Sequence, residues 1–514
     1  MLKKQLRIGK WCVIFMMLIA LPAQSNPLEI HGFLSQGYLQ TDRGDYLADT
    51  EEGTFKFNEM GINISSDLSD DIRLGIQFIS RTLGDLNENT SKVDWAYADY
   101  RWRDYLGFRF GRIKVPFGLY NEIRDIDMLR TSIFLPSGIY SEAWRDTLKS
   151  IDGFGLYGYL SLNALGGINY QALAGQLDIS DEGGVAKYVE HDGTVDLLHL
   201  DPQKTYCASI LWDMPIEGLS IGTSILSNKM KESSMVGDHF RFGELRMATD
   251  INAQLPEVFY QIVYDKIQNQ DLATQISSGY LDYMDLTQYQ SLDNQWPKEA
   301  NRNFFTMDFW VLSLKYQWGD LTLSAEHLDL RMNNDWYIGE VNLRNPAVAF
   351  HSIGYYVSAS YAILDWLELG VYYSEFYSDD NNKKSENFIK MTQNVFYKYP
   401  VAAIYENNAN RIREGFVDYA NAVFSMYNID HLKPDDVTAI QLISDYEYEK
   451  PKYHEYNQYF KELALSLSAQ ITDQWAFKLE GHFMDGIAFM DWTVNNGDIP
   501  QKRFMFASKV TFSF

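Results

Sequence analysis

The sequence predicts an all-β chain in which sixteen antiparallel strands close into a transmembrane barrel. Three observations support this prediction: segments in which apolar and polar residues alternate, connections that alternate between short and long, and a final segment ending on Phe514. Alternation with period two gives a strand one apolar and one polar face, so one face can meet hydrocarbon while the other meets water. Closure removes the unpaired edges that an open sheet would expose.

The chain begins with a pattern typical of a secretory signal peptide. Four basic residues precede an apolar run at 11–21, and small residues follow at Ala23 and Ser25. Because this run is too short to span a membrane, we expect residues 1–25 to be cleaved near Ser25, leaving 26–514 as the barrel. Their removal changes the net charge from −25 to −29 and leaves Cys207 as the only cysteine, so no intrachain disulfide is expected.

The composition suits a barrel that meets lipid with alternate residues. Aromatic residues make up 15% of the chain, with 35 tyrosines, and no segment after the leader has the ~18 consecutive apolar residues of a membrane helix. The strongly acidic charge argues against a nucleic-acid partner.

From Leu28 onward, sixteen alternating segments can be counted. They are expected at 28–41, 54–67, 72–82, 92–102, 106–115, 151–160, 166–176, 204–213, 218–230, 303–317, 321–332, 350–362, 367–378, 456–470, 474–486 and 501–514. In the last segment, Phe506 and Val510 fall on one face, and Arg503 and Lys509 fall on the other. The even total lets both chain ends lie on the same side of a membrane.

The connections between these segments alternate in length. Tight turns such as 66–71, 102–107 and 318–320 join the segments in pairs. The long connections are 116–150, 177–203, 231–302, 333–349 and 379–455, with shorter ones at 42–53, 83–91 and 487–500. A membrane barrel sorts short turns to one rim and long loops to the other, whereas a soluble sandwich has no physical reason to do so.

Aromatic residues mark the rim with the short turns. Tryptophans flank the tight turns at Trp102, Trp212, Trp318, Trp366 and Trp475. Tryptophan prefers the boundary between membrane and water, so we expect this rim to lie at headgroup level.

Two of the long connections are large enough to fold. The loops 231–302 and 379–455 contain the helix-like stretches 257–267 and 416–427. These stretches could cap the mouth, enter the lumen or cover a neighbouring subunit, and the sequence does not choose among these arrangements.

One part of the chain resembles a known family. The run DWAYADYRW at 94–102, followed by GFRFGR, PFGLYNE and FLPSGIY, resembles the phosphate-selective porin O and P type, and the resemblance extends over roughly residues 28–175. It implies a Gram-negative outer-membrane porin with periplasmic short turns and extracellular long loops, through which small hydrophilic or charged solutes diffuse passively. It also implies a homotrimer in contact with outer-membrane lipid and lipopolysaccharide, inserted by the barrel assembly machinery that reads the strand ending in Phe514.

By position, the resemblance makes 116–150 a loop that bends into the barrel and narrows it. The candidate constriction and solute-binding residues on this loop and the wall beside it are Arg73, Arg81, Arg101, Arg109, Arg112, Lys114, Glu122, Arg124, Asp125, Asp127 and Arg130. Fixed charges in a narrow pore set ion preference. Anion-selective relatives concentrate arginine and lysine in the lumen, whereas this chain is acidic, so solute and ion preference stay open. The alternative is a loop-gated channel selective for an anion such as phosphate or a carboxylate.

No catalytic residue, cofactor or metal site is expected. The nine histidines are scattered, and the sequence has no HExxH, GxSxG, P-loop or cysteine-rich metal spacing. Glu326-His327 and Glu190-His191-Asp192 come nearest to a charge-relay set. His327 shares a face with apolar residues, and the second group lies in a loop, where a solvated cluster is the simpler interpretation. A barrel enzyme or an adhesin is therefore the weakest of the alternatives.

Overall fold

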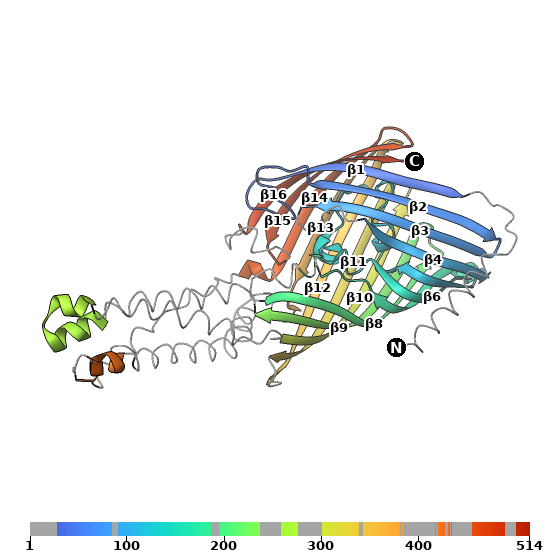
Figure 1. Cartoon of the computed structure of the whole chain (residues 1–514). Helices are drawn as coiled ribbons and strands as arrows, with labels where there is room; N and C mark the ends of the chain where they lie inside the picture. Colours follow the sequence, from blue (N-terminus) through green and yellow to red (C-terminus); the bar gives the residue numbers. More distant parts are fainter. Residues whose placement is uncertain are drawn as a thin grey trace, which may run out of the picture.

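The computed structural model describes residues 28–84, 91–181, 183–184, 186, 195–236, 259–275, 301–338, 343–380, 383, 417, 420–426, 430–431, 433, 455–488 and 500–514. Its strands form one closed antiparallel barrel in which β1 pairs with β16 and every other pairing joins neighbours in the sequence (Figure 1). The predicted closure, strand order and number of strands are confirmed.

The strands have the following bounds: β1 Glu29–Thr41, β2 Phe57–Ser69, β3 Ile72–Leu83, β4 Lys92–Arg103, β5 Leu106–Lys114, β6 Ser150–Ser161, β7 Gly167–Leu177, β8 Val195–Asp213, β9 Leu219–Val236, β10 Asn301–Trp318, β11 Leu321–Ile338, β12 Leu343–Leu364, β13 Leu367–Tyr377, β14 Tyr459–Gln470, β15 Trp475–Gly486 and β16 Lys502–Ser513. The pairs β2–β3, β4–β5 and so on to β14–β15 are joined by short turns, as predicted.

The ends of the chain close the barrel. The backbones of Gly32 and Phe514 exchange two hydrogen bonds, each 2.9 Å long. A Cβ atom at Gly32 would lie 2.5 Å from the ring of Phe514, so the missing side chain makes room for the terminal aromatic ring. The terminal strand therefore has paired neighbours on both sides, β1 and β15.

Four strands extend several residues past the predicted segments at their long-loop ends. β8, β9, β11 and β12 extend beyond the expected segments 204–213, 218–230, 321–332 and 350–362, and β11 and β12 remain paired as far as Ile338 and Leu343. The prediction was wrong there because it followed side-chain alternation. Backbone hydrogen bonding needs no particular side chain and continues past the apolar part of these strands.

The two faces of the wall alternate as expected. On β14, Leu465 is exposed on the outer face, whereas its neighbour Ala464 is fully buried on the inner face. Near the short-turn rim, Trp102 and Trp366 expose about half of their surface, and Trp318 exposes more. The outer face of the barrel is thus an apolar surface bordered by aromatic residues.

The inner face is not uniformly polar, and this corrects the expectation that each strand has one apolar and one polar face. Phe309, Val311 and Leu173 are buried inside the barrel, where they pack against Val115 and Phe117 of the segment that connects β5 to β6. A second apolar cluster places Phe134 of the same segment against Phe57 and Phe460. These contacts form the core of the molecule, and they lie within the barrel.

Short helices lie in both large connections, at 259–267, 270–275 and 420–426. Phe259 and Phe424 stack with ring centroids 5.8 Å apart, and both side chains are fully buried. In Figure 1 these helices lie apart from the barrel. Most other residues of the two loops, and the leader 1–25, lie outside the described residues. Among the described helices, none has the length and apolar character needed to cross a membrane.

Candidate functional site

Residues 115–149, called the inner segment below, connect β5 to β6 and contact inward-facing side chains around the barrel. The segment contains four single turns of helix: η1 Asn121–Ile123, η2 Asp127–Leu129, α2 Ser137–Tyr140 and η3 Glu142–Trp144. Because short irregular segments leave many backbone groups without a partner, the wall must supply hydrogen bonds to them.

Carboxylates on β14 and β15 bind the middle of the inner segment. Glu480 accepts hydrogen bonds from the backbone N–H groups of Ile133 and Phe134, the latter at 3.1 Å. Glu462 accepts a hydrogen bond from the hydroxyl of Ser137, and it lies 2.7 Å from Nδ1 of His482. All these groups are buried, so each hydrogen bond supplies a partner to polar atoms that water does not reach.

Glu326 on β11 binds two separate parts of the inner segment, one near η1 and one in α2. Its carboxylate accepts the backbone N–H of Leu119 at 2.9 Å and the hydroxyl of Tyr140. Contact with the wall is also close at α2, since a Cβ on Gly354 of β12 would lie 1.9 Å from the carbonyl oxygen of Gly138. Only glycine permits this approach of two backbones.

Two lysines hold η2 against β15 and β16. The Nζ of Lys478 donates to the carbonyl oxygens of Asp127, Arg130 and Ser132 at 2.7, 2.6 and 3.2 Å. The Nζ of Lys509 lies 2.8 Å from the carboxylate of Asp127. Burial opposes ionisation of this carboxyl, but Lys509 and Arg130 outweigh it and hold the pKa of Asp127 well below its ordinary value.

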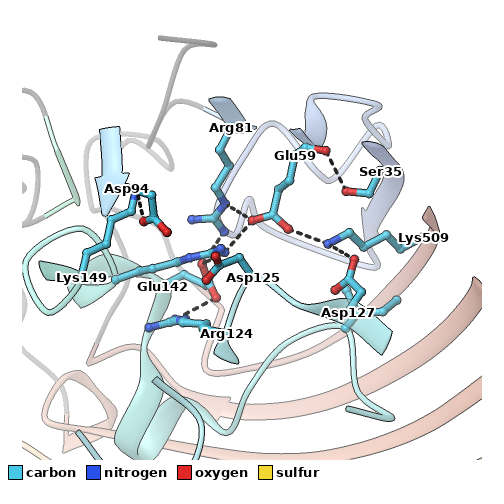
Figure 2. A network of polar contacts seen from close by, with 12 residues as sticks. Ser35, Glu59, Arg81, Asp94, Arg124, Asp125, Asp127, Glu142, Lys149 and Lys509 are labelled. Carbon is cyan, nitrogen blue, oxygen red and sulfur yellow. Dashed lines mark hydrogen bonds and ion pairs between the residues drawn. The ribbon is translucent and has the colours of Figure 1, made fainter. Parts of the chain in front are cut away.

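A network of alternating charges joins the inner segment to β2 and β3. Figure 2 shows Glu59 between Arg81 and Lys509. Glu59 Oε1 lies 3.0 Å from Arg81 Nε and 2.7 Å from Arg145 Nη1. Glu142 pairs with Arg81 and, at 2.9 Å, with Arg124. Burial opposes ionisation of Glu142, but the three arginines around it hold its pKa well below the ordinary value.

A small cavity of about 40 Å³ adjoins this network. Its cationic lining residues are Arg81, Lys92, Lys114, Arg124, Arg145 and Lys149, and its acidic ones are Asp125 and Asp146. Lys114 lies 2.7 Å from Asp125, and Lys149 lies 2.9 Å from Asp94. Burial, together with the positive charges of Lys92 and Arg81, lowers the pKa of Lys149 to about 8.

A second polar contact lies on the β4–β7 side of the inner segment. Arg109 pairs with Asp99 at 2.9 Å and lies over the ring of Tyr157, 4.3 Å from its centroid. Glu122 accepts a hydrogen bond from Gln171 at 3.0 Å, and burial raises the pKa of Glu122.

The sequence-predicted residues therefore fall into groups. Arg81, Lys114, Arg124 and Asp125 meet in the network and its cavity. Asp127 and Arg130 meet at the wall of β15 and β16, and Arg109 and Glu122 face β7.

Three predicted residues do not join these groups. Arg73 is half exposed near the short-turn rim, paired with Glu29 at 3.2 Å, and Arg101 is exposed close to the same rim. Arg112 lies on the outer face, because it pairs with Asp152 at 2.7 Å in register with the exposed Phe110 and Phe154. Arg112 thus does not line the lumen.

Several residues of the site were missing from the prediction. They are Glu59, Glu142, Arg145, Glu326, Glu462, Lys478, Glu480 and Lys509. The usable signal was a charged residue on the polar face of an alternating strand, as with Lys509 in 501–514. Only the closed barrel reveals that the strand positions among them face one common segment, to which Glu142 and Arg145 themselves belong.

Of the two candidate charge-relay sets, the structure describes only Glu326-His327, and it places the two side chains on opposite faces of β11. Glu326 is buried on the inner face, whereas His327 contacts the outer-face Trp310, with ring centroids 6.3 Å apart. Glu190, His191 and Asp192 lie outside the described residues. Within the described ranges, no three His, Cys, Asp or Glu side chains are grouped as a metal site.

No protein-family model matches the chain, and no curated relative matches it either. Among solved structures, the chain is similar to a loop-deletion mutant of OmpT, an outer membrane protein of Vibrio cholerae, at 8% identity and a TM-score of 0.45, covering 96% of this chain and 100% of that chain. It is also similar to OmpF of Salmonella typhi in complex with daunomycin, at 11% identity and a TM-score of 0.45, covering 95% and 98%. A third is an anion-selective porin from Comamonas acidovorans, at 10% identity and a TM-score of 0.42, covering 95% and 100%. The sixteen strands of this barrel are counted from the hydrogen-bonded pairs in its own structure, independently of these similarities.

Proposed function

We propose that this chain is an outer-membrane porin, a water-filled channel through which small hydrophilic or charged solutes diffuse passively. The observation that carries the proposal is a closed barrel that exposes apolar side chains outside while a charged segment is bound inside. Sixteen-stranded barrels are wide enough to leave an aqueous channel. An apolar outer face of this extent is costly in water and favourable in hydrocarbon.

The inner segment is the proposed constriction. It is bound at several separate walls, by Glu326 on β11, Glu480 on β15 and Lys509 on β16. Such multiple anchoring suits a permanent narrowing of the lumen, because a mobile gate would have to break many buried polar contacts at once. The cations around the small cavity are paired with buried carboxylates, so most of their charge is balanced within the network; these carboxylates are Glu59, Asp94, Asp125 and Glu142. The fixed charge that remains unbalanced along the pore sets its ion preference.

The proposed setting follows from the two rims. The short turns with their exposed tryptophans lie at the periplasmic boundary, and the long connections face outward among lipopolysaccharide. The leader 1–25 takes the chain across the inner membrane, and the assembly machinery recognises the terminal strand ending in Phe514. The barrel works as a homotrimer, the usual assembly of general porins.

The test is the current through purified protein in a planar lipid bilayer. Mature protein refolded in detergent should give discrete conductance steps, and a salt gradient should then report the sign of the constriction charge through the reversal potential. Protein heat-denatured before addition is the control. Correctly folded protein that gives no steps would rule out a channel.

A further inference from the structure

A second cavity, of about 160 Å³, lies between the inner segment and the wall formed by β10–β14. Ten of its nineteen lining residues carry hydroxyl groups, among them Thr322, Ser324, Ser358 and Ser360. We call it the hydroxyl cavity. An engineered protein cavity of roughly 150 Å³ holds a benzene-sized ring, so this space suits one six-membered ring.

The hollow exists because the wall side chains here are small. Gly370 of β13 faces Thr131 of the inner segment, and a Cβ on Gly370 would lie 3.1 Å from the Thr131 methyl carbon. On either side of this contact, serines and threonines leave space that larger inward residues fill elsewhere. Tyr120 closes one side, with its hydroxyl 3.0 Å from Ser324 Oγ. The cavity is therefore built by the sequence of these strands and is not a gap left by poor packing.

The charges in the hydroxyl cavity are of both signs. Its charged lining residues are Arg130, Lys315 and Glu368. Arg130 is engaged by Asp127 at 2.9 Å, whereas neither Lys315 nor Glu368 has an ion-pair partner among the described residues. A free anion in the cavity would face Glu368, and a free cation would face Lys315. A neutral solute with hydroxyl groups can instead accept a hydrogen bond from Lys315 and donate one to Glu368.

We propose that the hydroxyl cavity is a binding site for a small neutral polyhydroxylated solute, a monosaccharide in size and chemistry. Serine and threonine hydroxyls both donate and accept, so they match a solute whose groups do the same. The rings of Tyr120, Tyr356 and Tyr372 supply flat apolar faces beside these groups. Thr322 is the second residue of β11, and Glu368 is the second residue of β13. Both strands begin directly after a short turn, so the site is on the short-turn side of the constriction.

The inference builds on the proposed channel, and it is tested by current block. D-glucose added to a single open channel should interrupt the ion current in a saturable way, and sodium sulfate at the same osmolarity should not. The variant Thr322→Val with Ser360→Ala removes two hydroxyls without filling the cavity, so the half-blocking glucose concentration should rise about tenfold. Ser468→Ala, on the inner face of β14 outside the lining, is the matched control and should leave the block unchanged.

The outcomes separate the two proposals. Channels that open normally but show no glucose block, or a block equal in the cavity variant and the wild type, would overturn the carbohydrate site and leave the porin intact. Block by sulfate stronger than by glucose would also overturn it. Folded protein without conductance steps would overturn the porin proposal itself.

Discussion

Replacing Lys478 by methionine should release part of the inner segment while the barrel stays closed. Methionine matches the length of the lysine stem, so it leaves little empty space, but it removes three donors from three backbone carbonyls. Each hydrogen bond from a charged donor is worth about 1.5–3 kcal/mol. Because bonds from one group are not additive, we take the local loss as about 3–6 kcal/mol in total.

Hydrogen exchange measures this loss directly. Since about 1.4 kcal/mol corresponds to a factor of ten, backbone amides in 127–134 should exchange about 10² to 10⁴ times faster in Lys478→Met. Amides in β14 and β15 should keep their rates. Lys502→Met is the control, because the Lys502 side chain is largely exposed and makes a weak ion pair, with its Nζ 3.8 Å from the Asp485 carboxylate. Unchanged exchange in 127–134, or equal acceleration throughout the barrel, would refute the anchoring role of Lys478.

Three further predictions concern other contacts of the inner segment. Glu59→Gln leaves Arg81, Arg145 and Lys509 without their shared buried carboxylate, so thermal unfolding in detergent should show a loss of about 3–5 kcal/mol; a loss near zero would contradict the network. Gly354→Ala places a methyl 1.9 Å from a backbone oxygen of the inner segment, so the single-channel current should become noisier, and an unaltered current would mean that α2 does not pack there. Raising the pH from 7 to 9 should discharge Lys149, whose pKa is about 8, and shift the reversal potential towards cation preference. Arginine stays charged at pH 9, so this shift of the reversal potential should disappear in Lys149→Arg. A shift that persists in this variant would show that another group titrates.

The barrel was predictable because its signal is repeated along the chain. Each strand must alternate to meet two solvents, and the terminal run 501–514 shows this with Phe506 outside and Lys509 inside. Strand ends were less predictable, because backbone pairing in β11 and β12 continues after the alternation stops.

The site was predictable only in part, because its contacts join residues far apart in sequence. The inner segment could be located by resemblance, and several of its charged residues were named from it. The partners Lys478 and Glu480 are some 350 residues away, and no local pattern marks which inward position meets which loop residue. Arg112 shows the opposite error, since its position beside the loop suggested the lumen, while the pleat of β5 turns it outward.

The most direct test compares two neighbouring positions on β12. Ser360 lines the lumen, and Tyr361 is half exposed on the outer face. With Cys207 replaced by serine, a cysteine at either position should be treated with a charged thiol reagent while single-channel current is recorded. We expect a stepwise drop in current for Ser360→Cys and none for Tyr361→Cys. Equal effects at both positions, or a drop only for Tyr361→Cys, would contradict a barrel with water inside and hydrocarbon outside.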